Sequence, residues 1–230
     1  MTSHPASAPD HAHRRRGAPV IAARAATAPL LTWQPSLLDG GDPAVDAGFA
    51  GLVRHSLDGD AWVDHVSGWL RGSERLFVAL LEHADWQAVD VLMYGRVVSQ
   101  PRLVARWAID GDGPAPPPML EEIRSALCVG YRRPFNSIAA NLYRDGRDSV
   151  AWHGDRIPES VVDPVVATVS LGSARRFLMR PKGGAVGLRL DLGAGDLVVM
   201  GGTSQRTWEH AVPKTAATGP RISIALRHSE

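Results

Sequence analysis

The segment 141–155, which reads NLYRDGRDSVAWHGD, holds a histidine and a carboxylate two residues apart beside a turn. In an extended chain, the side chains of residues i and i+2 point the same way. The imidazole of His153 and the carboxylate of Asp155 can therefore reach one metal ion without strain. We predict that these two residues are metal ligands and that a third ligand comes from elsewhere in the chain.

The best candidate for the third ligand is His210, in the run TWEHAVPK. Two histidines and one carboxylate on one face of an ion form the facial triad of non-haem Fe(II) sites, which leaves positions open for oxygen and a co-substrate. Closed structural zinc sites usually include cysteine, and Cys128 is the only cysteine of the chain. Taken alone, H-x-D followed by a distant histidine is a weak pattern, because surface histidines also produce it.

A second pattern, the run RISIALR at 221–227, strengthens the first. Its apolar residues alternate with polar ones, which is typical of a strand, and Arg221 and Arg227 share the polar face. Six residues of extended strand span roughly 20 Å, so the two guanidinium groups could close on a short dicarboxylate between them, and arginine binds carboxylates bidentately. The alternative is a solvated edge strand with two surface arginines.

Four ordered runs resemble the AlkB family of Fe(II)- and 2-oxoglutarate-dependent dioxygenases. They read FNSIAANLYRDGRDSVAWHGD, VATVSLGSARRFLMR, GDLVVMGGTSQRTWEHAVPK and PRISIALR, and they cover about residues 135–228. The run MYGRVVSQPRL before them resembles the family more loosely. The sequence is most similar to the branch that acts on alkylated nucleobases.

The resemblance implies a site. Its three Fe(II) ligands would be His153, Asp155 and His210. Four residues would hold 2-oxoglutarate: Arg221 and Tyr143 at the C5 carboxylate, and Asn141 and Arg227 at the C1 end. The remaining implied contacts are with the substrate, and they are Trp107, Tyr94, Arg102, Arg156 and Ile157.

The implied activity is oxidative demethylation of N-alkylated bases, such as 1-methyladenine and 3-methylcytosine, in single-stranded or locally opened DNA or RNA. With Fe(II), 2-oxoglutarate and O2, the N-methyl group is hydroxylated and then lost as formaldehyde, a direct repair of alkylation damage. In the family, the segment matching 91–107 forms a hairpin over the base pocket. There, residues 94–100 would help to turn the base out, and Trp107 would form one wall of the pocket. The alternative for Trp107 is a core aromatic.

Two positions depart from the family pattern. Ile157 stands where many relatives have an acidic residue that faces the exocyclic amine of the base, which leaves base preference open. Ser223 stands where an asparagine is common. The alternatives are therefore the same chemistry on a modified tRNA base or a small molecule, or a non-catalytic nucleic-acid-binding module of the same fold.

The fold class that we expect is α+β, mainly β. Regularly spaced short strands with glycine-rich turns follow residue 131, which favours an antiparallel sandwich or barrel. The resemblance makes this a double-stranded β-helix, or jelly roll, over about 131–228, with N-terminal helices packed on it. We expect helices over 43–57, 73–86 and 118–130, with Ser73 as an N-cap and Gly130 as a C-terminal stop. Residues 30–35 form a short expected strand.

Composition sets the remaining limits. Residues 1–29 are rich in Ala, Pro, His, Arg and Ser without a regular period, so we expect a disordered tail and one domain over 30–230. No apolar run reaches the length of a membrane span, and a single cysteine fits a reducing compartment. We expect a monomer in a bacterial cytoplasm, with access to the nucleoid.

The charge pattern says less. The formal net charge is +1, and 23 of the 25 basic residues are arginines. Several lie on segments around the expected mouth of the site, where they could contact phosphates: Arg132, Arg133, Arg144, Arg147, Arg175, Arg176, Arg180 and Lys182. A solvated basic face explains such a run equally well.

Overall fold

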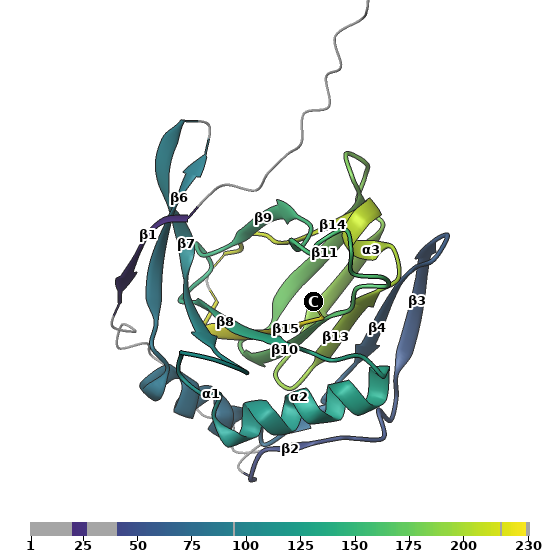
Figure 1. Cartoon of the computed structure of the whole chain (residues 1–230), viewed down its shortest axis with the longest axis horizontal. Helices are drawn as coiled ribbons and strands as arrows, with labels where there is room; N and C mark the ends of the chain where they lie inside the picture. The colour runs from purple at the N-terminus through teal and green to yellow at the C-terminus, as the bar shows by residue number, and fades with distance from the viewer. Residues whose placement is uncertain (1–19, 27–40, 94, 217, 229–230) are drawn as a thin grey trace, which may run out of the picture.

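The computed structural model describes residues 20–26, 41–93, 95–216 and 218–228. Two antiparallel sheets dominate it and enclose the space between them (Figure 1), as in a jelly-roll-like fold. Within the described residues the larger sheet has nine strands, in the order β1 (Val20–Ala25), β6 (Gln87–Met93), β7 (Arg96–Trp107), β8 (Ser137–Tyr143), β15 (Arg221–Arg227), β10 (Val166–Gly172), β13 (Leu197–Gly201), β4 (Ala61–Val66) and β3 (Val53–Asp58).

The smaller sheet has four strands in the described part of the chain, in the order β12 (Leu188–Leu192), β11 (Arg175–Pro181), β14 (Trp208–Val212) and β9 (Val150–His153). A short pair, β2 (Ala44–Val45) with β5 (Leu70–Arg71), lies apart. Three helices complete the described residues: α1 (Ser73–His83), α2 (Pro118–Tyr131) and α3 (Ser204–Thr207). None of these helices combines the length and hydrophobicity that a membrane-spanning helix needs.

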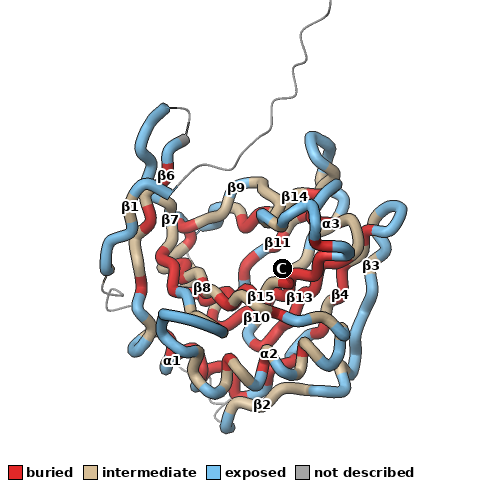
Figure 2. Tube along the Cα trace, viewed as in Figure 1, coloured by how far each residue is buried: buried red, intermediate tan, exposed pale blue. Residues whose placement is uncertain are grey.

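The larger sheet separates two apolar clusters, because strand side chains alternate between its faces. Ile222, Ile224 and Leu226 of β15 join a cluster that also holds buried residues of α1 and α2. Tyr143 and Met200 point to the other face, where they meet residues of the smaller sheet. Figure 2 shows β10, β13 and β15 as the most buried strands. The polar positions of β15 therefore face the space between the sheets.

The helix predicted over 43–57 is wrong. That segment forms β2, a turn and β3 instead. The Asp46 carboxylate accepts hydrogen bonds from the backbone amides of Gly48 and Ala50, and Phe49 and Gly51 have φ values of 52° and 74°. A turn held by an aspartate side chain competes with a helix, and apolar residues at helical spacing did not reveal it.

Smaller corrections concern the ends of elements. The tail expected to be disordered over 1–29 contains β1, whereas residues 1–19 lie outside the described part of the chain, as does the strand expected at 30–35. Helix α1 is preceded by Gly72 in a left-handed conformation, so Ser73 is its first residue and not its cap. Helix α2 continues past Gly130 and ends where Arg132 adopts a left-handed conformation. The predicted hairpin is confirmed as β6 and β7.

The turn after β13 requires glycine at position 202. Gly202 has a φ of 61°, and a Cβ added there would overlap the carbonyl oxygen of Asp60. We expect Gly202→Ala to lower the free energy of unfolding by about 2–4 kcal/mol, which lowers the melting temperature by about 5–15 °C. Gly183 is the matched control, because its φ is 75° but its Cβ would meet open space. Gly183→Ala should cost only about 1 kcal/mol, and equal losses in a thermal melt would contradict the steric account.

Candidate metal and co-substrate site

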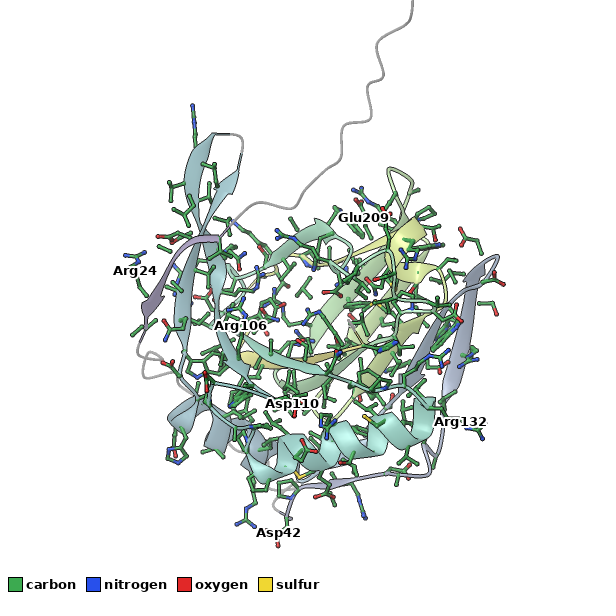
Figure 3. The ribbon with its side chains drawn as sticks, viewed as in Figure 1. Arg24, Asp42, Arg106, Asp110, Arg132 and Glu209 are labelled. Carbon is green, nitrogen blue, oxygen red and sulfur yellow. The ribbon has the colours of Figure 1, made fainter. Side chains whose placement is uncertain are left out.

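Two neighbouring strands of the smaller sheet bring the predicted histidines together. His153 of β9 is the direct cross-strand partner of His210 of β14, so the two side chains share a face. Their ring centroids are 4.2 Å apart, and Phe177 of β11 packs against the His210 ring at 5.5 Å. Glu209, one residue earlier and labelled in Figure 3, alternates to the opposite face of the strand and pairs with Arg180.

The tautomer of His153 suits a metal ligand. Its Nδ1 lies 2.9 Å from the carbonyl oxygen of Ala151 and 3.1 Å from that of His210. Carbonyl oxygens only accept hydrogen bonds, so Nδ1 carries the proton and the lone pair is on Nε2. A second ring nitrogen held by a carbonyl is the arrangement that orients metal-bound histidines.

Asp155 completes the cluster through a close backbone approach. A Cβ at Gly154 would lie 2.9 Å from the carbonyl oxygen of Gln205, so only glycine fits between the two ligand candidates. The side chain of Gln205, on α3, accepts a hydrogen bond of 3.0 Å from the Asp155 amide. The Asp155 carboxylate then lies between Arg227 of β15, at 2.8 Å, and His210 Nε2, at 3.8 Å.

Electrostatics keep the ligand candidates in their metal-binding protonation states. Burial acts to raise the pKa of Asp155, but the positive charge of Arg227, with His210 and His153, outweighs it and lowers this pKa to about 2. Burial lowers the pKa of His210 to about 3, with His153 adding to the effect and Asp155 opposing it. At neutral pH the carboxylate is therefore ionised and the imidazole of His210 is neutral, as metal ligands must be.

The donor set fits Fe(II), and its spacing is somewhat wide. Two ligands of one ion, each about 2.1 Å from it and at right angles, stand roughly 3 Å apart. The separation of 3.8 Å between His210 and Asp155 must shrink by less than about 1 Å, which side-chain rotation can supply. As they stand, no three His, Cys, Asp or Glu side chains in the described ranges are gathered tightly enough to hold an ion.

The burial of neutral His210 predicts a pH-dependent stability of the metal-free protein. The pKa of His210 in the folded chain, about 3, is below the ordinary value of 6.5. Between these two pH values, His210 is protonated in the unfolded chain and neutral in the folded chain. The contribution of His210 to the free energy of unfolding is therefore fully present above pH 6.5. It falls as the pH drops towards 3, by about 1–2 kcal/mol between pH 6.5 and 5. Urea unfolding across this range measures the slope. His210→Gln should flatten it, whereas His83→Gln, at a side chain 79% exposed, should not.

A buried arginine, Arg221, lies at the opposite end of β15 from Arg227. Arg221 is 1% exposed. Its Nε donates a hydrogen bond of 3.0 Å to Ser170 Oγ, and its Cζ lies 5.2 Å from the Tyr143 ring centroid. Its Nη1 is buried and has no hydrogen-bond partner among the described residues. A buried donor without an acceptor is costly, and a carboxylate ligand would satisfy it.

We call Arg221 and Tyr143 the carboxylate clamp. Asn141 and Arg227 lie between this clamp and the metal ligand candidates. Asn141 is the cross-strand partner of Ser223 and so shares the face of Arg221. Its Oδ1 accepts a hydrogen bond of 2.9 Å from Arg102 Nε of β7, which leaves its amide NH2 to donate. Arg102, predicted as a substrate contact, thus acts directly on Asn141, and burial lowers its pKa, with Arg106 and Arg227 adding to the effect. Arg106, labelled in Figure 3 beside β7, is exposed.

The remaining substrate contacts are less well supported. Trp107 pairs with Ile138 and packs against the helix-side cluster. It therefore lies on the face away from His210, which favours the alternative of a core aromatic over a pocket wall. Ile157 packs against the cluster between the sheets, Arg156 is exposed, and Tyr94 lies outside the described residues.

Three residues that position this site were missed. Gln205 holds the Asp155 backbone, Ser170 holds Arg221, and Arg175 lies over the other side chain of the clamp, with its Cζ 5.4 Å from the Tyr143 ring centroid. All three lie within runs that carry the resemblance, but nothing in their types or spacing distinguishes them. Arg175 is 3% exposed, so it lies in the interior and not on the exposed basic face that its sequence context suggested.

Comparisons with known proteins agree with this geometry. The chain matches the model of the 2OG-Fe(II) oxygenase superfamily over residues 71–227. It is 34% identical over 120 residues to alpha-ketoglutarate-dependent dioxygenase alkB homolog 3 of Mus musculus, a match that covers 48% of this chain and 42% of that protein. It is 31% identical over 189 residues to DNA oxidative demethylase ALKBH2 of Arabidopsis thaliana, covering 66% and 60%. The matches thus span less than two thirds of these relatives.

A solved structure, that of OsALKBH1, has a similar fold. It superimposes with a TM-score of 0.52 at 14% sequence identity, covering 76% of this chain and 100% of that one. At this identity the likeness supports the fold alone, which is the jelly-roll-like arrangement of antiparallel sheets described above.

Proposed function

The chain belongs to the 2OG-Fe(II) oxygenase superfamily and, within it, to the AlkB family of dioxygenases, and from that premise we propose that it oxidatively demethylates N-alkylated nucleobases in DNA or RNA. Members of the family use Fe(II), 2-oxoglutarate and O2. The fold would be a double-stranded β-helix whose N-terminal helices cover one face of the larger sheet. The substrate class follows the second relative named above, which is a DNA oxidative demethylase, and bases such as 1-methyladenine and 3-methylcytosine are the first candidates.

In this proposal His153, Asp155 and His210 hold the iron. Arg221 and Tyr143 hold the C5 carboxylate of 2-oxoglutarate. Asn141, whose side chain Arg102 orients, and Arg227 hold the C1 end. When bound, the iron with 2-oxoglutarate and O2 supplies the oxidising power that hydroxylates an N-methyl group. The hydroxymethyl product then loses formaldehyde without further catalysis.

The protein's own side chains orient the metal ligands, balance their charge and hold the co-substrate. Gln205 fixes the backbone of Asp155, so the carboxylate keeps its direction as ligands exchange. Arg227 balances the Asp155 charge from the side of the larger sheet. The buried Arg221 binds a dicarboxylate away from water, where a charged hydrogen bond is strong. These groups are in place before substrate arrives, which is what preorganised catalysis requires.

One observation carries the proposal. The two histidines and the carboxylate come from β9, the residues just after it and β14. The buried guanidinium, whose Nη1 has no partner among the described residues, comes from β15 on the facing sheet. A single space is therefore lined by an iron-type donor set at one end and a carboxylate clamp at the other. A non-catalytic binding module does not need this combination.

The direct test is turnover. The full chain is loaded anaerobically with Fe(II) and 2-oxoglutarate, mixed with oligonucleotides carrying single methylated bases, and exposed to oxygen. We expect formaldehyde and succinate in equal amounts with at least one of 1-methyladenine or 3-methylcytosine. Succinate without formaldehyde across all methylated bases would support the alternative, a modified tRNA base or small molecule as substrate. The absence of both products would contradict the enzymatic proposal.

The β6–β7 hairpin supports the nucleic-acid part of the proposal. It projects beyond the body of the protein in Figure 1, and Leu92, Val97 and Val98 on it are 39%, 62% and 41% exposed. Exposed apolar side chains on a projecting element suit insertion beside a base that leaves its stack. The monomeric state and the bacterial cytoplasmic location stay predictions.

A further inference from the structure

A cavity of about 250 Å³ lies beside the start of β11 and the loop after β14, away from the iron ligand candidates. Its polar lining comes from Arg175, Arg176, Asp191, Lys214, Thr215 and Thr218. Three of these side chains are cationic and one is a carboxylate. Arg176 and Asp191 are already 3.5 Å apart as an exposed pair, so the lining keeps an excess of positive charge.

Arg175 is a buried cation in the lining of this cavity. It is 3% exposed, and its guanidinium donates to the carbonyl oxygens of Asp145, Asp148 and Pro213 at 3.2, 2.8 and 2.7 Å. Carbonyl oxygens satisfy its protons but carry no full charge, and its Nε has no partner in the described part of the chain. Burial lowers the pKa of Arg175, and Tyr143, Asp148 and Asp145 oppose this effect only in part, so the buried cation remains costly. An anion in the cavity would reduce that cost.

We propose that this cavity binds a phosphate group and that its occupancy weakens the binding of 2-oxoglutarate. Its lining residues supply guanidinium, ammonium and hydroxyl donors, and a tetrahedral oxyanion has acceptor oxygens for such donors. The phosphate could belong to a nucleic-acid backbone or be free in solution. The binding part stands on the cavity alone, whereas the effect on 2-oxoglutarate rests on the proposed function.

The link between the two sites is the Tyr143 ring. The Cζ atoms of Arg175 and Arg221 lie 5.4 and 5.2 Å from its centroid, so both positive charges act at the carboxylate clamp. A negative charge beside Arg175 cancels part of the attraction that the C5 carboxylate feels. Coulomb's law at an intermediate dielectric constant gives about a threefold to tenfold loss of affinity. Linkage requires that 2-oxoglutarate weaken phosphate binding by the same factor.

Calorimetry on the full chain tests both parts. Inorganic phosphate is titrated at constant ionic strength, and the Kd of 2-oxoglutarate is measured on the metal-loaded protein with and without phosphate. The double variant R176Q/K214Q should lose phosphate binding, and its Kd for 2-oxoglutarate should no longer respond to phosphate. The control R189Q/K182Q removes the same charge from exposed positions outside the cavity and should behave as wild type.

Each outcome of the titrations either supports or overturns the inference. Phosphate that binds wild type and R176Q/K214Q equally, or that fails to bind wild type, overturns the inference. A phosphate effect on 2-oxoglutarate that persists in R176Q/K214Q also overturns it, because that result indicates direct competition at the clamp. Displacement of phosphate by an unmethylated single-stranded oligonucleotide supports a backbone phosphate as the ligand, and no displacement supports free phosphate. Phosphate binding needs no turnover, so a failed demethylation assay leaves this test intact.

Discussion

Asp155→Asn is expected to reduce turnover by about a thousandfold or more while the chain stays folded. The substitution keeps the shape of the side chain but removes the negative charge that the metal requires, and a bound metal ion contributes several kcal/mol to the reactions it supports. It also leaves Arg227, 2.8 Å from the carboxylate, without its ionic partner. Formaldehyde release and Fe(II) affinity are the measurements, and both should fall.

Asp145→Asn provides the matched control. Asp145 lies in the same sequence motif, and its ion pair with Arg147 is exposed. Exposed pairs contribute little to stability, so both turnover and iron affinity should stay close to wild type. Turnover that survives Asp155→Asn, or that falls equally in both variants, would contradict the assignment of Asp155 as a ligand.

Arg221→Met should separate co-substrate binding from stability. Removing a buried charged hydrogen-bond partner costs about 2–5 kcal/mol of binding, so the KM for 2-oxoglutarate should rise by about 30-fold to 1000-fold. The unliganded protein should lose little stability, because Arg221 is buried with an unpartnered Nη1 and apolar replacements of buried ions are often tolerated. Steady-state kinetics and a thermal melt provide the two measurements.

The same pair of measurements can overturn this account of Arg221. A variant that unfolds, or that loses stability without change in KM, would make Arg221 a structural residue. Arg189→Met, at an exposed position of β12, controls for the loss of one positive charge and should leave KM unchanged. A clamp role also predicts that 2-oxoglutarate raises the melting temperature of wild type but not of Arg221→Met.

Part of the candidate site could be predicted from the sequence because its geometry is local. The i, i+2 spacing of His153 and Asp155 and the alternation along β15 are properties of an extended chain, and the structure keeps both. The pairing of His153 with His210 is not local, since it depends on how β9 and β14 meet. The facial-triad pattern named His210 only as a candidate, and the resemblance to a known family strengthened it.

The predictions that the structure does not support have physical causes of their own. Trp107 was assigned to the pocket although Arg102 and Arg106, of opposite parity on the same strand, are the residues that lie near Arg227. Strand parity shows which residues share a face but does not show which face is the site. The segment 43–57 shows the limit of apolar spacing, because the Asp46 turn depends on side-chain contacts that a periodic pattern does not encode.

The convergence of three ligands on one iron is the central claim, and a crystal structure of the full chain grown anaerobically with Fe(II) and 2-oxoglutarate tests it most directly. The account predicts one anomalous iron peak within bonding distance of His153 Nε2, His210 Nε2 and the Asp155 carboxylate, with 2-oxoglutarate extending from it to Arg221. An iron peak elsewhere, or one that lacks His210 as a ligand, would contradict the account.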